Sequence, residues 1–198
     1  PPLDFRRQRQ MCIRDRNWNE LFETLNLIRD ELKETFPYKV LQVDGAEADD
    51  IIATIVNLVS KTPNLFEKIL IMSGDKDFIQ LQTHENVQQY SPTLKKFING
   101  IDPNTYKIEH IFKGDRGDGI PNILSPDNTF VEGLRQKPLG KNKIDSWKQV
   151  GTWPIDDWNE EIKRNYQRNC KLIDLDLIPS HIRAVSYTHL RAHETLGN

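Results

Sequence analysis

The chain has 198 residues, and its 27 Lys and Arg residues nearly balance its 29 Asp and Glu residues to give a formal net charge of −2. This balance excludes a strongly basic protein that coats nucleic acid, although it leaves room for a locally charged site. With 37% hydrophobic and 28% charged residues, the composition is that of a folded chain rather than a disordered one.

Apolar runs and cysteines narrow the class of protein further. No apolar run approaches the ~18 residues that span a bilayer, so we expect no membrane-embedded segment. Cys12 and Cys170 are the only cysteines, which is too few for a disulfide framework or a thiolate zinc site. We therefore expect a cytoplasmic protein in a reducing environment, and we expect it to be a monomer.

Both ends of the chain are predicted to be non-native, over residues 1–16 and 186–198. Arg7 to Arg16 and Ser186 to Thr195 resemble translated sequencing-adapter read-through. The alternative is an ordinary polar, flexible terminus at each end. On either interpretation these segments are left out of the functional argument.

The first half of the remaining chain predicts alternating helices and strands. Apolar residues recur at three- and four-residue steps from Leu21 to Phe36 and predict a helix that Pro37 ends. Residues 40–43 form a short β-prone run, and residues 51–59 again show helical spacing. Residues 68–73 form a continuous apolar run, which is typical of a strand buried on both faces of a parallel sheet. Strand, helix and strand in this order predict a right-handed βαβ unit.

Acidic residues follow both predicted strands. Ligands bind beyond the carboxyl ends of parallel strands, so these acids are expected to share one rim. Two carboxylates ~4 Å apart repel by about 4 kcal/mol at an effective dielectric near 20, so such crowding favours bound cations. Oxygen ligands of this kind suit Mg²⁺ or Mn²⁺. The acids are Asp44, Glu47, Asp49 and Asp50 after the first strand, and Asp75 and Asp77 after the second.

The second half of the chain predicts a hairpin, a helix and a glycine-rich loop. Residues 87–90 and 94–98 are expected to pair as a hairpin at the edge of the sheet. Asp102 and Pro103 fit the N-cap and first position of a helix, which ends at Lys113-Gly114. The following glycine-punctuated stretch, residues 114–122, has backbone amides that can bind an anion, and beyond it the chain is polar and helical in pieces.

Three motifs in this order resemble the 5′-nuclease family of flap endonucleases and phage 5′-3′ exonucleases, and most of all its phage-encoded ribonuclease H branch. They are Glu47-Ala48-Asp49-Asp50, Gly74-Asp75-Lys76-Asp77-Phe78 and Gly114-Asp115-Arg116-Gly117-Asp118-Gly119-Ile120-Pro121-Asn122. The resemblance implies an α/β, PIN-like fold with a mainly parallel central sheet flanked by helices. It also implies a C-terminal helical region with a helix-three-turn-helix motif. We expect a partial catalytic domain over residues 17–100 and the helical DNA-binding region over residues 101–185.

The resemblance also implies a site for two Mg²⁺ or Mn²⁺ ions. The implied metal ligands are Glu47, Asp49, Asp50, Asp75, Asp77, Asp115 and Asp118, of which Glu47, Asp50, Asp75 and Asp77 are the catalytic set. K⁺ is expected at the glycine loop, which in the family grips duplex phosphates. The implied nucleic-acid contacts are Lys95, Lys96, Lys113, Gly114, Arg116, Gly117 and Gly119.

The implied reaction is hydrolysis of phosphodiester bonds, in which two metal ions polarise the phosphate and activate a water molecule. The expected substrates are DNA with 5′ ends or flaps and RNA·DNA hybrids, as in removal of lagging-strand primers. A single-stranded-DNA-binding protein is the implied partner, in the cytoplasm of a phage-infected bacterium. The family's opening strand with its Asp and its basic helical arch are expected before Trp18. Since this chain lacks them, we expect an incomplete metal site and weak or no activity of the chain itself.

Two other interpretations stay open at this point. The first is a catalytically silent, structure-specific DNA-binding module, which would keep the glycine loop and tolerate loss of the acids. The second is a phosphatase or phosphotransferase with an Asp nucleophile after a strand, although the sequence has no Asp-X-Asp-X-Thr arrangement. Tryptophans at positions 147, 153 and 158 could stack on bases, but packing between helices is the favoured role. Asp174 and Asp176 are expected to serve the local fold.

Overall fold

The structure is a computed structural model that describes residues 17–62, 67–149 and 158–195. It divides into two compact units, Pro1–Leu41 with Ala192–Asn198, and Gln42–Arg191. The second unit contains the predicted catalytic part from residue 42 onward and all of the predicted helical part. The boundary between those parts, like the non-native ends, stays a prediction.

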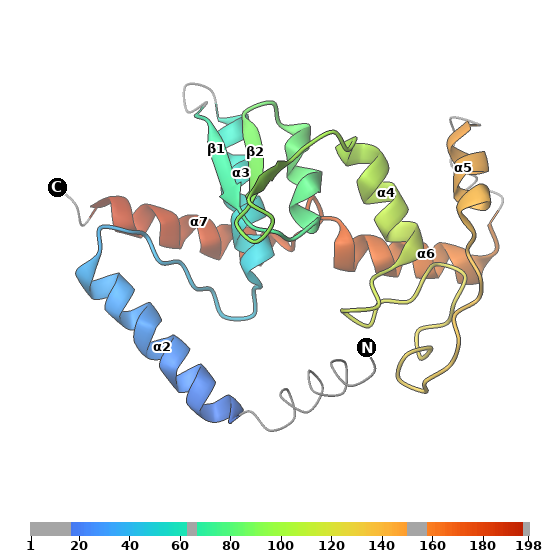
Figure 1. The fold of residues 1–198 in the computed structure, drawn as a ribbon, viewed down its shortest axis with the longest axis horizontal. Helices are drawn as coiled ribbons and strands as arrows, with labels where there is room; N and C mark the ends of the chain where they lie inside the picture. The colour runs from blue at the N-terminus through green and yellow to red at the C-terminus, as the bar shows by residue number, and fades with distance from the viewer. Residues whose placement is uncertain (1–16, 63–66, 150–157, 196–198) are drawn as a thin grey trace. The chain divides into compact units, whose positions relative to one another are not determined.

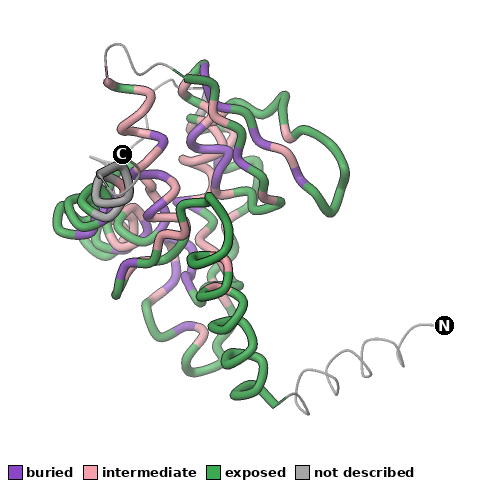
Figure 2. Tube along the Cα trace, turned by 90° about the vertical axis from the view of Figure 1, so that its left-hand side faces the viewer, coloured by how far each residue is buried: buried purple, intermediate pink, exposed green. Residues whose placement is uncertain are grey.

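The described part of the first unit is dominated by one helix, α2 (Trp18–Thr35), as Figure 1 shows. Asn17 caps its start, because the Asn17 side chain accepts a hydrogen bond from the Glu20 amide at 3.3 Å. The helix ends just before Pro37, as predicted. None of its residues is buried (Figure 2), and the apolar stripe includes Leu25 and Ile28 at 50% and 48% exposure.

Residues 40–43 lie in a loop, so the predicted strand there is wrong. The βαβ unit that this strand would open is wrong with it. β-prone residues form a strand only where a neighbouring strand completes the ladder of hydrogen bonds. Among the described residues no strand pairs with this segment.

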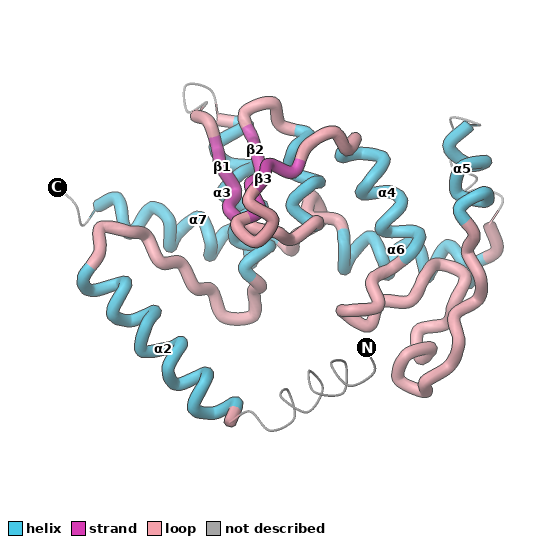
Figure 3. Tube along the Cα trace, viewed as in Figure 1, coloured by secondary structure: helices cyan, strands magenta, loops and turns pink. Residues whose placement is uncertain are grey.

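The sheet has three strands in the described chain: β1 (Ile69–Met72), β2 (Val87–Ser91) and β3 (Lys96–Ile98). β1 runs parallel to β2, with Ile69 opposite Val87, and the crossover between them is the 3₁₀ helix η1 (Asp77–Thr83). β2 and β3 are antiparallel, which confirms the predicted hairpin (Figure 3). One pair is thus parallel and one antiparallel, where a mainly parallel sheet was expected.

The core beside the sheet is built from one face of β1 together with helices. In β1 Ile71 is 6% exposed, whereas Leu70 and Met72 are 52% and 66% exposed, so the predicted burial on both faces is wrong. Ile71 packs with residues of α3 (Ala48–Lys61), η1, β2 and α7 (Ser180–Thr195). This core holds β1 and η1 in place, and therefore the loop between them.

A second core joins the helices that follow the sheet, α4 (Pro103–Lys113), α5 (Lys141–Gln149) and α6 (Glu160–Ile173). Phe112, which is fully buried, lies edge-on to Trp147 and Trp158 with ring centroids 5.3 and 5.7 Å away. These two tryptophans pack between helices, as expected, while Trp153 lies outside the described residues. Cys170 borders the same cluster.

Polar contacts connect the two cores. The Gln80 side chain in η1 donates to the Ile173 carbonyl at 3.0 Å and accepts from the Leu175 amide at 3.3 Å. Lys107 of α4 binds Asp174 and Asp176 at 3.2 and 2.8 Å. The two aspartates therefore serve the local fold. No helix in the described part of the chain is long and apolar enough to cross a membrane.

Candidate functional site

The first group of predicted site residues lies at the start of α3. Glu47 is the N-cap, and it forms a capping box with Asp50: the Glu47 amide donates to Asp50 Oδ2 at 3.1 Å. A capping box satisfies backbone donors at a helix start. Glu47 and Asp50 therefore have a structural role in the chain, which a role as metal ligands would have to share.

The second group lies between β1 and η1. The Asp75 amide donates to Ser73 Oγ at 3.1 Å, and the Asp77 amide donates to Asp75 Oδ1 at 3.0 Å. The turn is fixed from the sheet side by Gln89, which is 1% exposed and donates to the carbonyl oxygens of Ser73 and Asp75. This network positions the two carboxylates at the carboxyl end of β1, as the sequence predicted.

The third group lies in the glycine loop after α4, residues 114–119. Gly114 ends the helix at φ 66°, and a Cβ there would lie 2.3 Å from the Ile120 carbonyl oxygen, so only glycine fits. Asp115 Oδ1 accepts hydrogen bonds from the amides of Gly117 and Asp118 at 2.6 and 3.4 Å. The loop is thus closed around the Asp115 side chain.

His110 joins the second and third groups. Its Nδ1 lies 3.1 Å from Asp77 Oδ1 and its Nε2 lies 3.2 Å from Asp115 Oδ2, and the side chain is 12% exposed. The Asp77 carboxylate is the largest cause of a raised His110 pKa, although burial opposes it. His110 Nδ1 meets Asp77 as an ion pair without the alignment of a hydrogen bond, and the protonated ring places one positive charge between the two carboxylates.

Burial and the charges of neighbouring acids raise the pKa values of Asp49 and Asp118. Burial, together with the charges of Asp75 and Asp77, raises the pKa of Asp49 to about 6. Burial also raises the pKa of Asp118, as do Asp115, Asp77 and Asp75. The pKa of Asp115 instead falls, because hydrogen bonds from Gly117 and His110 outweigh the effect of burial. The three groups therefore form one anionic region, here called the acidic rim.

The acidic rim suits a divalent cation by the chemistry of its donors, since carboxylate oxygens are what Mg²⁺ and Mn²⁺ prefer. In the conformation described here, however, no three His, Cys, Asp or Glu side chains among the described residues are grouped closely enough to hold an ion. His110 and the capping box at α3 already use oxygens of Asp77, Asp115 and Asp50.

The residues predicted to contact nucleic acid are found in two places. Lys95 and Lys96 lie at the tip of the β2–β3 hairpin and are exposed. Lys113, Gly114, Arg116, Gly117 and Gly119 lie at the end of α4 and in the glycine loop, where Lys113 pairs with Glu109. The helix that follows the loop in the described residues begins at Lys141, so the helix-three-turn-helix motif stays a prediction.

Sequence reasoning missed three residues of the rim: His110, Gln89 and Tyr106. Tyr106 and His110 are one turn apart on α4, with ring centroids 5.7 Å apart. Burial, together with the charges of Asp77 and Asp75, raises the pKa of Tyr106 to about 12. A Tyr and a His four residues apart on one predicted helix were the available signal. For Gln89 there was none, because a glutamine in a strand is normally solvated.

Comparison with solved structures shows the fold. The T5 D15 protein, crystallised with metal ions, superposes with a TM-score of 0.67 at 21% identity, over 96% of this chain and 77% of that protein.

Comparison with curated sequences finds nuclease relatives. Ribonuclease H of Enterobacteria phage T4 is 34% identical over 172 residues, which are 84% of this chain and 55% of the relative. A 5′-3′ exonuclease of Buchnera aphidicola subsp. Acyrthosiphon pisum is 33% identical over 101 residues, which are 47% of this chain and 34% of the relative. The chain thus spans about half the length of the phage relative and a third of the bacterial one.

A family model, the 5′-3′ exonuclease N-terminal resolvase-like domain, matches residues 7–111. The matched range contains the capping box at α3, the β1–η1 turn and most of α4 with His110, which together carry most of the acidic rim. The match covers more than half of the chain and agrees with both other comparisons. The chain therefore belongs to the 5′-3′ exonuclease family.

Proposed function

We propose that the chain is part of a divalent-metal-dependent 5′-3′ exonuclease or flap endonuclease. It hydrolyses phosphodiester bonds at the 5′ ends of DNA or of RNA·DNA hybrids, as in removal of lagging-strand primers. Membership of the exonuclease family supports this reaction class.

One observation carries the proposal, namely the convergence of acids from three separate chain segments on the acidic rim. Asp49 comes from α3, Asp75 and Asp77 follow β1, and Asp118 follows α4, yet Asp75 and Asp77 raise the pKa of both other groups. Such crowding opposes folding unless an opposite charge relieves it. A rim of this kind is suited to binding cations.

The chain's own residues would hold and orient the reacting groups. Glu47, Asp49, Asp50, Asp75 and Asp77 would hold one or two Mg²⁺ or Mn²⁺ ions, and Asp115 and Asp118 would complete the surroundings. When bound, these ions supply Lewis-acid polarisation of the phosphate and a more acidic water molecule. Gln89 fixes the turn that carries Asp75, so this ligand is held before the substrate arrives.

The nucleic acid would lie against the glycine loop. The amides of residues 114–119 and the side chains of Lys113 and Arg116 would contact phosphates, with Lys95 and Lys96 as further contacts. The same proposal includes a K⁺ ion at the glycine loop and a single-stranded-DNA-binding protein as partner. For the RNA·DNA substrate, we note that the T4 relative is named a ribonuclease H.

The direct test is cleavage of labelled 5′-flap DNA and RNA·DNA substrates by the chain in Mg²⁺ and in Mn²⁺. Asp75→Asn and Asp77→Asn should each lower turnover by at least about 100-fold, since loss of an outer-shell partner alone costs about 10- to 100-fold. Glu85→Gln removes the same charge from an exposed position after η1 and should cleave at the parent rate. Equal rates in all four proteins would refute the assigned roles.

A second candidate is a non-catalytic, structure-specific DNA-binding module. It is favoured by the absence, among the described residues, of three side chains already grouped around an ion position. This module would bind flap DNA with the parent affinity after Asp75→Asn and would cleave nothing in either metal. The same assay therefore separates the two candidates.

A further inference from the structure

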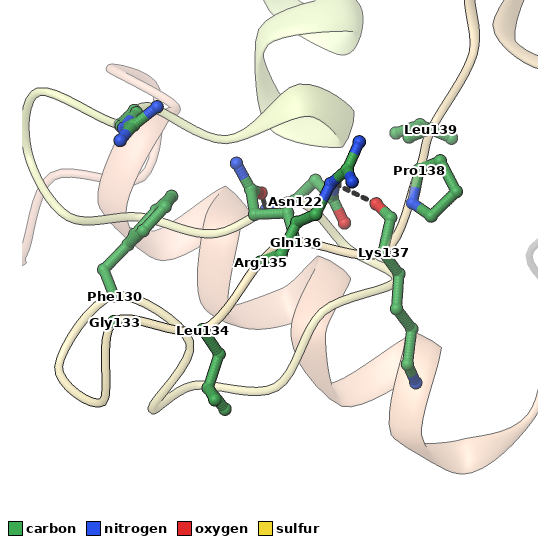
Figure 4. A pocket seen from close by; sticks show the side chains of 10 residues that line it. Asn122, Phe130, Gly133, Leu134, Arg135, Gln136, Lys137, Pro138 and Leu139 are labelled. Atoms are coloured by element: carbon green, nitrogen blue, oxygen red, sulfur yellow. Dashed lines mark hydrogen bonds between the residues drawn. The ribbon is translucent and has the colours of Figure 1, made fainter.

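A loop beyond the glycine loop lines a solvent-open cavity of about 620 Å³. It is lined by Arg116, Asn122, Phe130, Gly133, Leu134, Arg135, Gln136, Lys137, Pro138 and Leu139 (Figure 4). Only Arg116 and Asn122 come from the stretch that the sequence motifs single out. Of the remaining wall residues, Leu139 packs against the second core, and none belongs to the acidic rim.

The walls of this cavity are fixed by hydrogen bonds to a buried asparagine. Asn122 is 6% exposed. The backbone amide of Asn122 donates to Gln136 Oε1 at 2.7 Å. Its side-chain amide donates to the Lys137 carbonyl at 2.9 Å, a contact dashed in Figure 4. The Lys137 amide in turn donates to Ser125 Oγ at 2.9 Å. The segment that carries Arg135 and Lys137 is therefore held in place without a ligand.

The lining carries three cationic side chains and no carboxylate. Within the described part of the chain, Arg116 and Arg135 form no ion pair. Lys137 approaches Glu161 at 3.9 Å, where both side chains are about half exposed, so this pair is weak. Asp127, a neighbouring acid, is already paired with Arg164 and Arg168. In a chain with a net charge of −2, the cavity is a local concentration of unneutralised positive charge.

The composition of the lining points to a phosphate ligand. Guanidinium groups bind phosphate oxygens with two parallel hydrogen bonds, and an ammonium adds a point charge. Phe130 and Leu134 provide apolar surface beside these cations, which lowers the competition from water. Arg116 belongs both to the cavity and to the glycine loop, so a strand that contacts the loop can continue into the cavity.

We propose that this cavity binds a backbone phosphate of the nucleic-acid substrate, beyond the contacts made by the glycine loop. The proposal rests on the proposed function for the identity of the substrate. It assigns Arg135 and Lys137 as phosphate contacts and Asn122 as the residue that positions them. A free nucleotide or inorganic phosphate has the same chemistry and is the other source to be tested.

The test measures binding of the chain to fluorescently labelled 5′-flap DNA by anisotropy, with Ca²⁺ in place of Mg²⁺ to prevent cleavage. The variant is Arg135→Gln with Lys137→Gln. The matched control is Lys68→Gln with Lys171→Gln, which removes two charges from exposed positions away from the cavity. We expect the cavity variant to bind about tenfold more weakly than the control. Its slope of log affinity against log salt should be smaller by about 2, one for each lost contact.

Several results would overturn the inference. Equal affinity and equal salt slope in the two double variants would do so, and so would no binding by the parent chain. A third result would assign the cavity to a free phosphate instead. In that case the parent chain and the cavity variant bind DNA equally, but only the parent chain binds inorganic phosphate or a mononucleotide. Thermal unfolding of both variants controls for folding.

The same proteins separate this inference from the proposed function. If Asp75→Asn abolishes cleavage while the cavity variant binds as tightly as the control, the nuclease proposal stands and the cavity proposal fails. If Asp75→Asn and Asp77→Asn cleave at the parent rate but the cavity variant loses affinity, the cavity proposal stands and the roles assigned in the nuclease proposal fail.

Discussion

The acidic rim and the basic cavity are adjacent regions of opposite charge, and consecutive residues connect them. Asp115 faces His110 on the rim side, whereas Arg116 lines the cavity. Lys107, by contrast, is neutralised within the chain by Asp174 and Asp176. The rim has one shared histidine for several acids, and the cavity lining has no acid at all. Charge that a fold leaves unbalanced in two fixed places is available for ligands of opposite sign.

The largest effect is expected where the two regions meet, at Gly114. Gly114→Ala places a methyl group against the Ile120 carbonyl and forces an L-residue to a positive φ. We expect a loss of stability on the order of 3 kcal/mol, measured by urea unfolding. Gly119→Ala also has a positive φ but meets nothing within 4 Å, so it should cost only about 1 kcal/mol. Equal costs would mean that the close contact does not constrain the loop.

The next-largest effect is expected at Asn165 of α6, which holds part of the loop that lines the cavity. Asn165 is fully buried and donates to the carbonyls of Ile123 and Ser125 at 3.1 and 3.0 Å. Asn165→Ala leaves both acceptors unsatisfied and should cost about 2 kcal/mol. It should also weaken DNA binding while leaving metal binding at the rim unchanged. The control is Asn128→Ala, at an exposed position of the loop that contains Ile123 and Ser125. If the metal affinity of Asn165→Ala falls as much as its DNA affinity, the rim and the cavity do not act separately.

A third experiment sharpens the comparison from the rim side. Without divalent cations, Asp77→Asn should change the free energy of unfolding little, because it removes both the repulsion between Asp77 and Asp49 and the ion pair between Asp77 and His110. With Mg²⁺ at ten times its dissociation constant, the parent chain should gain about 1.4 kcal/mol. Asp77→Asn should gain less. Calorimetric melting with and without Mg²⁺ measures the stability that each protein gains from the metal. An identical gain in both proteins would remove Asp77 from the site.

The smallest effect concerns the internally neutralised charges. Hydrogen bonds from Lys107 outweigh burial and lower the pKa of Asp176 below its ordinary 3.8. Hydrogen bonds with Asp176 and Asp174 likewise raise the pKa of Lys107 above 10.5 despite burial. The ion pair between Lys107 and Asp176 therefore stabilises the fold fully between the ordinary pKa values of 3.8 for Asp176 and 10.5 for Lys107. It is lost as the pH falls through the lowered Asp176 pKa or rises through the raised Lys107 pKa.

Because the Asp176 side chain is 58% exposed, we expect at most about 1 kcal/mol from this bridge. Lys107→Met should lose that amount at pH 7 and show a flatter decline of stability below about pH 4 than the parent chain. Urea unfolding at a series of pH values measures it. An unchanged pH profile would show that the bridge contributes nothing.

Local patterns predicted α2, α3 and α4, whereas α5, α6 and α7 were expected only as part of a region helical in pieces and η1 was not predicted. The helical spacing of residues 51–59, the N-cap at Asp102 and the glycine at position 114 each depend on short-range rules, and each is found in the structure. Residues 40–43 failed because a strand depends on a partner elsewhere in the chain. The exposure of Leu70 and Met72 failed for a related reason, since an apolar run does not show which face another element covers.

The site was predicted to a similar extent. The chain order of the acidic loops and the edge rule for parallel strands place Asp75 and Asp77 beside β1, and the structure has them there. His110 could not be predicted from spacing, because its two partners belong to segments brought together only by the packing of α4 on η1. The role of Asn122 in holding Gln136 and Lys137 depends likewise on how a long loop folds back.

The aromatic cluster behind the glycine loop has a practical consequence. Phe112 precedes Gly114 by two residues, and Trp147 and Trp158 stack around it with centroids 5.6 Å apart from each other. Indole emission from this cluster is an intrinsic optical probe of the end of α4. Since these are two of the four tryptophans of the chain, we expect occupancy of the neighbouring loop to change the tryptophan fluorescence of the unmodified protein.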